Sequence, residues 1–285
     1  MDISVVIPLY NEDESLGELY SWISKVMLKN NFSYEVIFMN DGSTDNSWGV
    51  IQQLAAKNEN VKGIRFRKNQ GKSNALNVGF KHTQGDVVIT MDADMQDSPD
   101  EIPELYRMIM EEDYDLVSGW KKERHDPFSK TFPSKFFNAL TRWTSGIKLH
   151  DFNCGLKAYR SETAKSLDIY GEMHRYLPVL AHWNGFKITE IPVLHHPRKH
   201  GVTKFGASRY VKGFLDLLTL LFTSRYLKRP LHFFGTVGTL MGLVGFGIDA
   251  WLTVEWIMGE TFLSNRPAAL LGIALIIVGV QLVSL

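Results

Sequence analysis

The sequence has little of what a secreted, disulfide-stabilised protein needs. Only one of its 285 residues is cysteine, Cys154, which excludes an internal disulfide and favours a reducing compartment. The first residues lack the basic stretch of a secretory signal and lead directly into an apolar run. Net charge is also absent, with 31 basic and 31 acidic residues, and no internal repeat or low-complexity linker is visible. The composition is that of an ordinary folded protein.

Charged residues are missing from two stretches near the C-terminus. Phe233–Ile248 has none, and its apolar character continues through Asp249 to Met258. Ala268–Leu285 is also uncharged and would form a helix about 27 Å long, barely enough to cross a bilayer core. Frequent glycines favour close helix packing in lipid over a soluble helix. We therefore expect a transmembrane hairpin over residues 231–285. Its second helix is still apolar at the last residue, as expected of a truncated helix. The alternative is a buried pair of helices in a soluble domain.

Basic residues are concentrated just before these stretches. Between Arg198 and Arg229 the chain has eight Lys or Arg and one acid. The apolar side chains of Tyr210–Phe222 fall on one helical face. We predict amphipathic helices over residues 206–230 that lie on an anionic membrane surface, the alternative being an ordinary core helix. The same cations predict that the large domain is cytoplasmic and the protein a multi-pass protein of the cytoplasmic membrane.

Residues 1–205 alternate short apolar runs with helical patterns, which predicts an α/β domain built on a mostly parallel sheet. Strands are expected at Ser4–Leu9, Glu35–Met39, Val61–Phe66, Val87–Met91, Leu116–Ser118 and Ile188–Val193. Helices are expected at Glu14–Leu28, Asn46–Lys57, Ser73–His82 and Pro99–Glu112, the last with a capping box of Ser98 and Glu101.

Two carboxylates follow one of these strands directly. Asp92 and Asp94 come after the run Val87–Met91, and ligands of open α/β sheets bind at the carboxyl ends of strands. Carboxylates this close are stabilised by a hard divalent cation such as Mg²⁺ or Mn²⁺, which prefers oxygen ligands. The alternative is a solvated acidic turn, because an Asp-x-Asp pattern has many chance matches.

Other strand ends also carry polar residues. Asp41 follows a strand and could accept hydrogen bonds from a base or ribose, and the segment Pro8–Glu12 could hold a nucleotide in the same way. Asn69–Ser73 begins a helix and offers backbone amides with a lysine, an arrangement that favours anions. Each of these could equally be a plain strand-to-helix turn or cap.

Taken together, these motifs resemble the inverting family 2 glycosyltransferases of the GT-A fold. The motifs are Ile7–Glu12, Asn40–Asp45, Asn69–Lys72, Gly85–Asp86 and Asp92–Asp97, in that order. Asp151–Gly155, Tyr159–Arg160 and Arg198–Lys204 are similar to segments of the polyprenyl-phosphate glycosyltransferases, such as dolichol-phosphate mannose synthases and bacterial undecaprenyl-phosphate sugar transferases. Asn40 departs from the pattern, since many relatives have Asp there. The Gln-x-x-Arg-Trp pattern of processive synthases is absent.

The resemblance implies a set of site residues. The nucleotide sugar would contact Pro8, Tyr10, Asn11, Glu12, Asp41, Lys72, Asp92 and Asp94. The metal would be held by Asp94 and Gln96, with Asp92 contacting metal or ribose. Asp151 would be the catalytic carboxylate beside Asp94, or else a residue that caps a turn.

The implied acceptor is a lipid monophosphate, whose second pKa of about 6 makes its oxygen nucleophilic without a strong base. The enzyme must therefore hold two anionic substrates together, for which arginine and lysine are suited. The candidates for the acceptor phosphate are Arg160, Arg198, Lys204, Lys122 and Arg124, the last two being as compatible with a solvated basic loop.

The predicted function is transfer of one sugar from a nucleotide-diphosphate donor, UDP-linked in the first place and GDP-mannose in the second, to polyprenyl phosphate. A different lipid or glycan acceptor, a nucleotidyltransferase and a non-catalytic sugar-nucleotide-binding scaffold are the competing hypotheses. A nucleotidyltransferase is expected to have a basic glycine-rich N-terminal loop, which Pro8–Glu12 is not. Association of copies through the membrane helices is a further expectation, and no nucleic-acid partner is expected.

Overall fold

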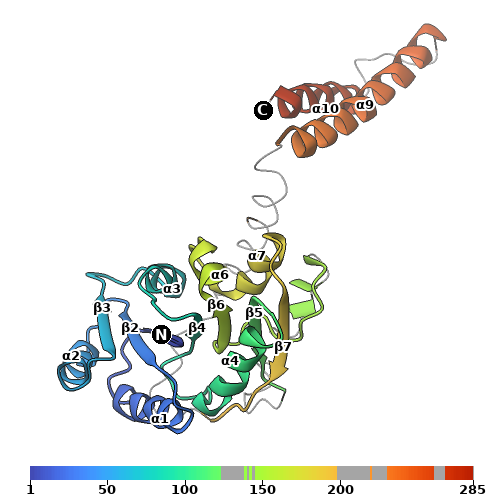
Figure 1. Ribbon diagram of the computed structural model, residues 1–285. Coiled ribbons are helices and arrows are strands. Elements are labelled where there is room, and N and C mark those ends of the chain that lie inside the picture. The colour runs from blue at the N-terminus through green and yellow to red at the C-terminus, as the bar shows by residue number, and fades with distance from the viewer. Residues whose placement is uncertain are drawn as a thin grey trace. The chain divides into compact units, whose positions relative to one another are not determined.

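The computed structural model describes residues 1–122, 138–139, 141–142, 145–197, 219, 230–259 and 267–284 (Figure 1). The chain divides into two compact units, Met1–Asp216 and Leu217–Leu285. The first contains the predicted catalytic domain and the second the predicted hairpin. The amphipathic segment predicted at 206–230 lies almost entirely outside the described residues and stays a prediction.

The described elements of the first unit run from strand β1 to strand β7. The described strands are β1 Ile3–Leu9, β2 Tyr34–Asn40, β3 Val61–Arg65, β4 Val87–Thr90, β5 Leu116–Trp120, β6 Lys157–Arg160 and β7 Ile188–Pro192. The described helices are α1 Leu16–Lys29, α2 Ser47–Lys57, α3 Lys72–Lys81, α4 Ile102–Met110, α6 Ser161–Ser166 and α7 Leu177–Trp183, with 3₁₀ turns η1 Pro99–Glu101 and η2 Met173–Tyr176.

The described strands form one mixed sheet in the order β3-β2-β1-β4-β6-β5-β7. Neighbours β3, β2, β1 and β4 are parallel, whereas β6 pairs antiparallel with both β4 and β5. The sequence predicts the other six strands but not β6. The fold class is confirmed, with an antiparallel strand inserted into the predicted sheet.

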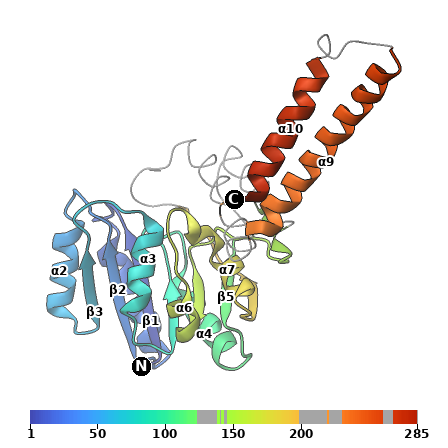
Figure 2. The same cartoon turned by 90° about the horizontal axis from the view of Figure 1, so that it is seen from above.

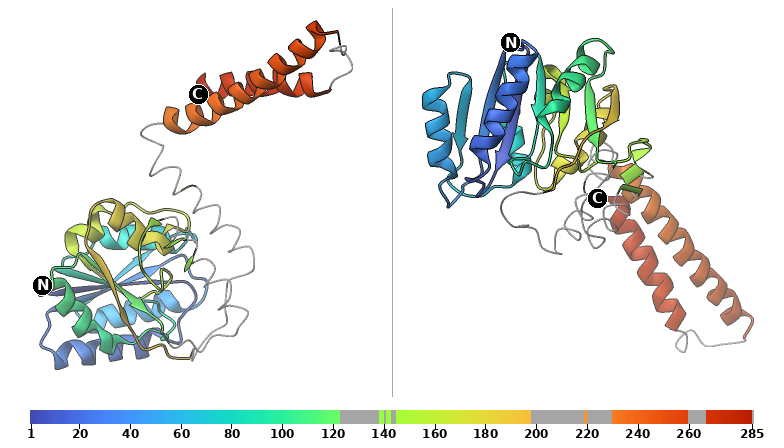
Figure 3. Two further views of the ribbon diagram at one scale, coloured as in Figure 1. Left: turned by 90° about the vertical axis from the view of Figure 1, so that its right-hand side faces the viewer. Right: turned by 90° about the horizontal axis from the view of Figure 1, so that it is seen from below.

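Helices cover both faces of this sheet. Figures 1 and 3 show α1 and α4 on one face and α3 and α6 on the other. Alternate side chains of β1 therefore point to opposite faces of the sheet. Ile3, Val5 and Ile7 belong to the core that includes α1 and α4, while Val6 faces Gly79 of α3. A Cβ at position 79 would lie 2.5 Å from the Val6 side chain, so α3 packs close to the strands that carry the site.

The predicted capping box at Ser98 is wrong in one detail. The Ser98 hydroxyl accepts the backbone N–H of Asp100 at 3.3 Å, as an N-cap does. The Glu101 side chain, however, accepts the backbone N–H of Leu194 at 3.2 Å. A tertiary contact therefore replaces the local one, and it ties η1 to the segment that follows β7.

The second unit contains two long apolar helices, α9 (Pro230–Ile257) and α10 (Pro267–Ser284), which run antiparallel side by side (Figure 2). Both are long and apolar enough to cross a membrane. Glycines bring them together, because a Cβ at Gly238 would lie 2.5 Å from the carbonyl oxygen of Gly279. The Asp249 carboxylate packs against Gly272 of the other helix. The predicted close packing through glycine is confirmed within this unit.

Candidate active site

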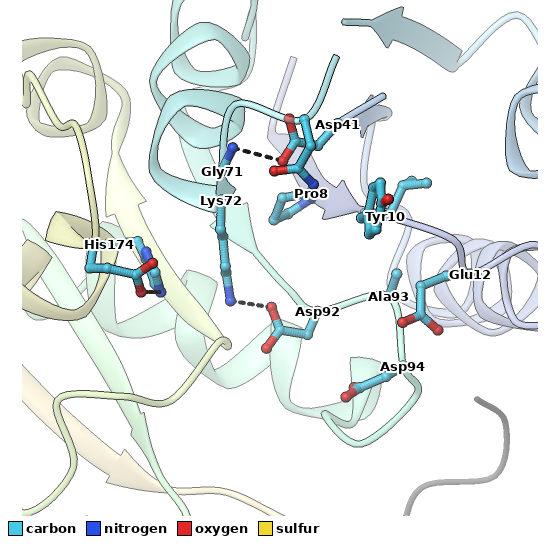
Figure 4. A pocket seen from close by; sticks show the side chains of 13 residues that line it. Pro8, Tyr10, Glu12, Asp41, Gly71, Lys72, Asp92, Ala93, Asp94 and His174 are labelled. Atoms are coloured by element: carbon cyan, nitrogen blue, oxygen red, sulfur yellow. Dashed lines mark hydrogen bonds and ion pairs between the residues drawn. The ribbon is translucent and has the colours of Figure 1, made fainter. Parts of the chain in front are cut away.

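A cavity of about 350 Å³ opens at the edge of the sheet where β1, β2 and β4 end (Figure 4). These strands are parallel, so the polar residues that follow them meet there. The cavity is lined by Pro8, Leu9, Tyr10, Glu12, Asp41, Asn69, Gly71, Lys72, Asp92, Ala93, Asp94, Glu172 and His174. Seven of the eight residues predicted to contact the nucleotide sugar are among them.

The eighth, Asn11, joins the two loops on this side of the cavity. Its side-chain oxygen accepts the backbone N–H of Thr44 at 2.8 Å, and its own N–H donates to the Ser43 hydroxyl at 2.9 Å. Asn11 has φ 54°, a left-handed conformation that asparagine tolerates better than most residues. It therefore positions its neighbours Tyr10 and Glu12, which do line the cavity.

Asp41 anchors the loop that leads into α3. Its carboxylate accepts the backbone N–H groups of Gln70 at 2.7 Å and Gly71 at 2.9 Å. Burial raises the pKa of Asp41 even though both hydrogen bonds favour the charged form. Gly42 makes the turn possible: its φ is 71°, and a Cβ there would lie 2.5 Å from the backbone of Lys68.

Asp92 and Lys72 form an ion pair on the cavity wall, where their side chains are 34% and 27% exposed. Burial opposes ionisation of Asp92, but the charge and hydrogen bond of Lys72, with further help from Lys121, lower the pKa of Asp92 to about 2. Asp94 lies farther along the same wall and its carboxylate accepts the Gln96 N–H at 3.2 Å. The turn passes through Met95 at φ 59°, an uncommon conformation for such a residue.

Asp97 ends the same turn but does not line the cavity. Its side chain is fully buried and pairs with Lys121, with 2.7 Å between Oδ1 and Nζ. The Asp97 carboxylate raises the pKa of Lys121 although burial opposes it. Gly155 packs between the two acids: a Cβ there would lie 2.6 Å from Asp92 Oδ2 and 2.8 Å from Asp97 Oδ2. A glycine is therefore required where the motif Asp151–Gly155 passes this turn.

The predicted residues Gln96 and Asp151 do not line the cavity. The Gln96 amide donates to the backbone oxygen of His196 at 3.4 Å. Asp151 is buried, and its carboxylate accepts the backbone N–H of Asn153 at 3.0 Å. This is the hydrogen bond of the turn-capping alternative for Asp151, while its catalytic role stays a prediction.

Arg160 lies at the opposite edge of the sheet. It pairs with Val87, the first residue of β4, because β6 runs antiparallel. Its guanidinium contacts Asp113 at 3.0 Å and Asp115 at 3.3 Å. The structure therefore places Arg160 away from the cavity, in contrast to its predicted role at the acceptor phosphate.

Lys122 is exposed after β5, and its ammonium lies 6.0 Å from the centre of the Trp120 ring. Arg124, Arg198 and Lys204 lie outside the described residues.

Sequence reasoning did not find Glu172 and His174. They belong to a turn after α6 with no strand-end motif, and they reach the cavity because this turn packs on α3. The Ser73 hydroxyl lies 3.0 Å from His174 Nδ1 and accepts the His174 backbone N–H at 2.9 Å. These residues are 101 positions apart, so only the tertiary fold reveals the contact.

A comparison with known families agrees with the resemblance of the strand-end motifs. Residues 4–167 match the model of glycosyl transferase family 2. The chain belongs to this family. It is 33% identical over its full length to dodecaprenyl-phosphate galacturonate synthase from Rhizobium johnstonii, covering 85% of that protein. It is 36% identical, over 99% of its length and 84% of the relative, to undecaprenyl-phosphate 4-deoxy-4-formamido-L-arabinose transferase from Shewanella sediminis.

Solved structures agree with the fold. Glucosyl-3-phosphoglycerate synthase from Mycobacterium tuberculosis, crystallised with Mn²⁺, UDP-glucose and phosphoglyceric acid, aligns with a TM-score of 0.61 at 20% identity. The alignment covers 77% of this chain and 79% of that one. The family 2 glycosyltransferase described here therefore has the GT-A fold, as its sequence predicts.

Proposed function

We propose that this glycosyltransferase moves a single sugar from a nucleoside-diphosphate sugar, UDP-linked, to polyprenyl phosphate at the cytoplasmic face of a membrane. The observation that carries the proposal is the cavity, in which Asp41 from the end of β2 and Asp92 and Asp94 from the end of β4 face one space. The two relatives whose names specify a polyprenyl phosphate, matched over nearly the whole chain, support the acceptor.

The nucleoside fits the side of the cavity built by β1 and β2. Pro8 and Tyr10 offer an apolar wall, and Asp41 offers a carboxylate already oriented by two backbone N–H groups. A base or ribose donor bonding to an ionised carboxylate forms a charge-assisted hydrogen bond. Because Asn11 ties the two loops together, this wall is set before a ligand arrives.

The diphosphate fits beside Asp92 and Asp94. Their carboxylates suit Mg²⁺ or Mn²⁺, and among the described residues no cluster of three or more acidic, histidine or cysteine side chains could hold an ion alone. That donor set suits a cation whose remaining ligands are substrate phosphates. Such a cation, when bound, would stabilise the charge that develops on the leaving diphosphate. Lys72, paired with Asp92, is a cation of the chain on this wall and can turn to a phosphate.

Attack by the acceptor needs no strong base, because a phosphate monoester is already largely ionised at neutral pH. An acceptor oxygen that forms its bond to the anomeric carbon as the bond to the diphosphate breaks inverts that carbon. Arg124, Arg198 and Lys204 remain our candidates for holding the acceptor phosphate, and Lys122 is exposed at the end of β5. Asp151 remains a candidate for orienting a cation or taking a residual proton.

The membrane helices explain why a lipid acceptor is suited to this chain. A polyprenyl phosphate is confined to a bilayer, and α9 and α10 could keep the enzyme at the same surface. The basic residues between Arg198 and Arg229 favour the orientation in which the first unit is cytoplasmic.

The test is transfer of label to lipid. Membranes containing the full chain are incubated with radiolabelled UDP- and GDP-sugars, undecaprenyl phosphate and Mn²⁺ or Mg²⁺, and the lipid is extracted. We expect label in an acid-labile lipid product with a UDP-sugar and none without the lipid phosphate. Label in a lipid other than a polyprenyl phosphate, or no transfer from any donor, would contradict the proposal.

A further inference from the structure

The wall of the cavity opposite the nucleoside side carries a matched donor and acceptor. Glu172 and His174 lie on it, and in Figure 4 His174 is on the far side of the Lys72–Asp92 pair from Tyr10 and Glu12. If the nucleoside occupies the Tyr10 side and the diphosphate lies at Asp92, the next group of the donor is its sugar. The inference thus rests on the proposed function.

His174 is held in one orientation and one protonation state. The Ser73 oxygen accepts the His174 backbone N–H, and the Ser73 hydrogen can donate to Nδ1. In this arrangement the ring proton is on Nε2. Burial, with the charges of Lys72 and Arg175, lowers the pKa of His174 well below its usual value, so the ring is neutral at pH 7.

Glu172 is held equally firmly and faces this nitrogen. Its Oε2 accepts a hydrogen bond from Arg175 at 2.8 Å and keeps a further lone pair. The distance between Glu172 Oε2 and His174 Nε2 is 4.0 Å, too long for a direct hydrogen bond. One oxygen about 2.8 Å from each atom spans such a gap. Both side chains are partly exposed to the cavity, at 30% and 16%.

We infer that Glu172 and His174 bind one hydroxyl of the donor sugar, with His174 Nε2–H donating to its oxygen and Glu172 accepting its hydrogen. A hydroxyl is the group that this pair satisfies, since it both accepts and donates. A carboxylate in the same place would meet the charge of Glu172, and a deoxy position would leave both groups unpaired. The pair therefore selects a neutral hydroxyl at this position of the sugar and is a specificity determinant of the donor.

The test compares a donor with its nucleoside diphosphate. Binding of UDP, UDP-glucose, UDP-galactose, UDP-N-acetylglucosamine, GDP and GDP-mannose to the full chain in detergent with Mn²⁺ is measured by calorimetry. The sugar nucleotide that binds best is then used for Glu172→Ala, Glu172→Gln and His174→Phe. Glu104→Gln is the control, because Glu104 is an exposed acid on α4 paired with Arg107.

We expect Glu172→Ala and His174→Phe to weaken the sugar nucleotide about tenfold or more and its nucleoside diphosphate less than about twofold. Glu172→Gln keeps an acceptor and should lose less. Equal losses for both ligands, or no loss in the folded Glu172→Gln and Glu172→Ala proteins, would overturn the inference and leave the proposed function intact. Failure of the wild type to bind any of the sugar nucleotides would overturn the proposed function as well.

Discussion

Asp92 and Asp97 belong to the same turn after β4, and each pairs with a lysine, yet their surroundings are opposite. Asp92 lies on the cavity wall, and Lys72 reaches it from the start of α3. Asp97 is fully buried, and Lys121 reaches it from the end of β5. Gly155 separates the two carboxylates.

The difference shows how one acidic motif serves two purposes. The pair at Asp92 is open to ligands, so its charge can be shared with a bound cation or phosphate. The pair at Asp97 is buried and cannot bind a ligand, so we assign it a structural role. It holds the turn through Met95 that carries Asp92 and Asp94. Removing one partner of a buried pair costs far more than removing one partner of an exposed pair.

The largest effect should come from the open pair and should be seen in activity alone. Asp92→Asn removes a charge beside the leaving diphosphate, and we expect sugar transfer to fall roughly 100- to 1000-fold. The thermal midpoint should stay within about 2 °C of wild type, because the site is partly exposed. Transfer near the wild-type rate, with Glu104→Gln as control, would place Asp92 outside the chemistry.

The closed pair should show the reverse pattern. Lys121→Met leaves Asp97 charged and buried, which should cost about 3–5 kcal/mol and lower the thermal midpoint by roughly 6–20 °C. Adding Asp97→Asn removes the unpaired charge and should restore part of that loss. A midpoint unchanged in Lys121→Met, measured by calorimetry on the full chain, would show that the pair does not hold the turn.

The smallest effect concerns pH. The pKa of Asp92 is about 2 in the folded chain and about 3.8 unfolded, so the stability that its charge contributes is present above pH 3.8 and is lost as pH falls toward 2. In Lys72→Met, the loss of unfolding free energy between pH 5 and pH 3 should be smaller than in wild type. The difference should be less than about 1 kcal/mol, because the pair is partly exposed. Urea unfolding at pH 5 and pH 3 gives the change in unfolding free energy between these two pH values. The same change in wild type and in Lys72→Met would show that Lys72 does not set the pKa of Asp92.

Strand ends explain what the sequence could predict. β1, β2 and β4 are mostly apolar and almost entirely buried, so the residues after them could be assigned to one edge of a parallel sheet. β6 escaped prediction because Lys157–Arg160 is four residues long and begins and ends with a charge. The direction of β6 determines where Arg160 lies. Because β6 is antiparallel to β4, its last residue lies beside the first residue of β4, at the edge of the sheet opposite the cavity.

The rest of the site depends on packing between distant segments. Nothing local marks Glu172 or His174, whose place is set by the contact with Ser73. The resemblance assigned Gln96 to the metal, and in the fold its amide N–H donates to the backbone oxygen of His196, so the metal role stays a prediction. Motifs therefore predicted the residues on the sides of the cavity to which we assign the nucleoside and the diphosphate, and only the fold revealed Glu172 and His174, at the side where we place the sugar.

We propose above all that the Asp92–Asp94 edge of this cavity carries metal-assisted sugar transfer to a lipid phosphate. The most direct measurement is the initial rate of label transfer from the preferred donor to undecaprenyl phosphate by purified wild type and Asp94→Asn, each with Mn²⁺ and with EDTA. We expect rapid transfer only by wild type with Mn²⁺, and a folded Asp94→Asn protein slower by orders of magnitude. Full activity of wild type in EDTA, or of Asp94→Asn with Mn²⁺, would contradict it.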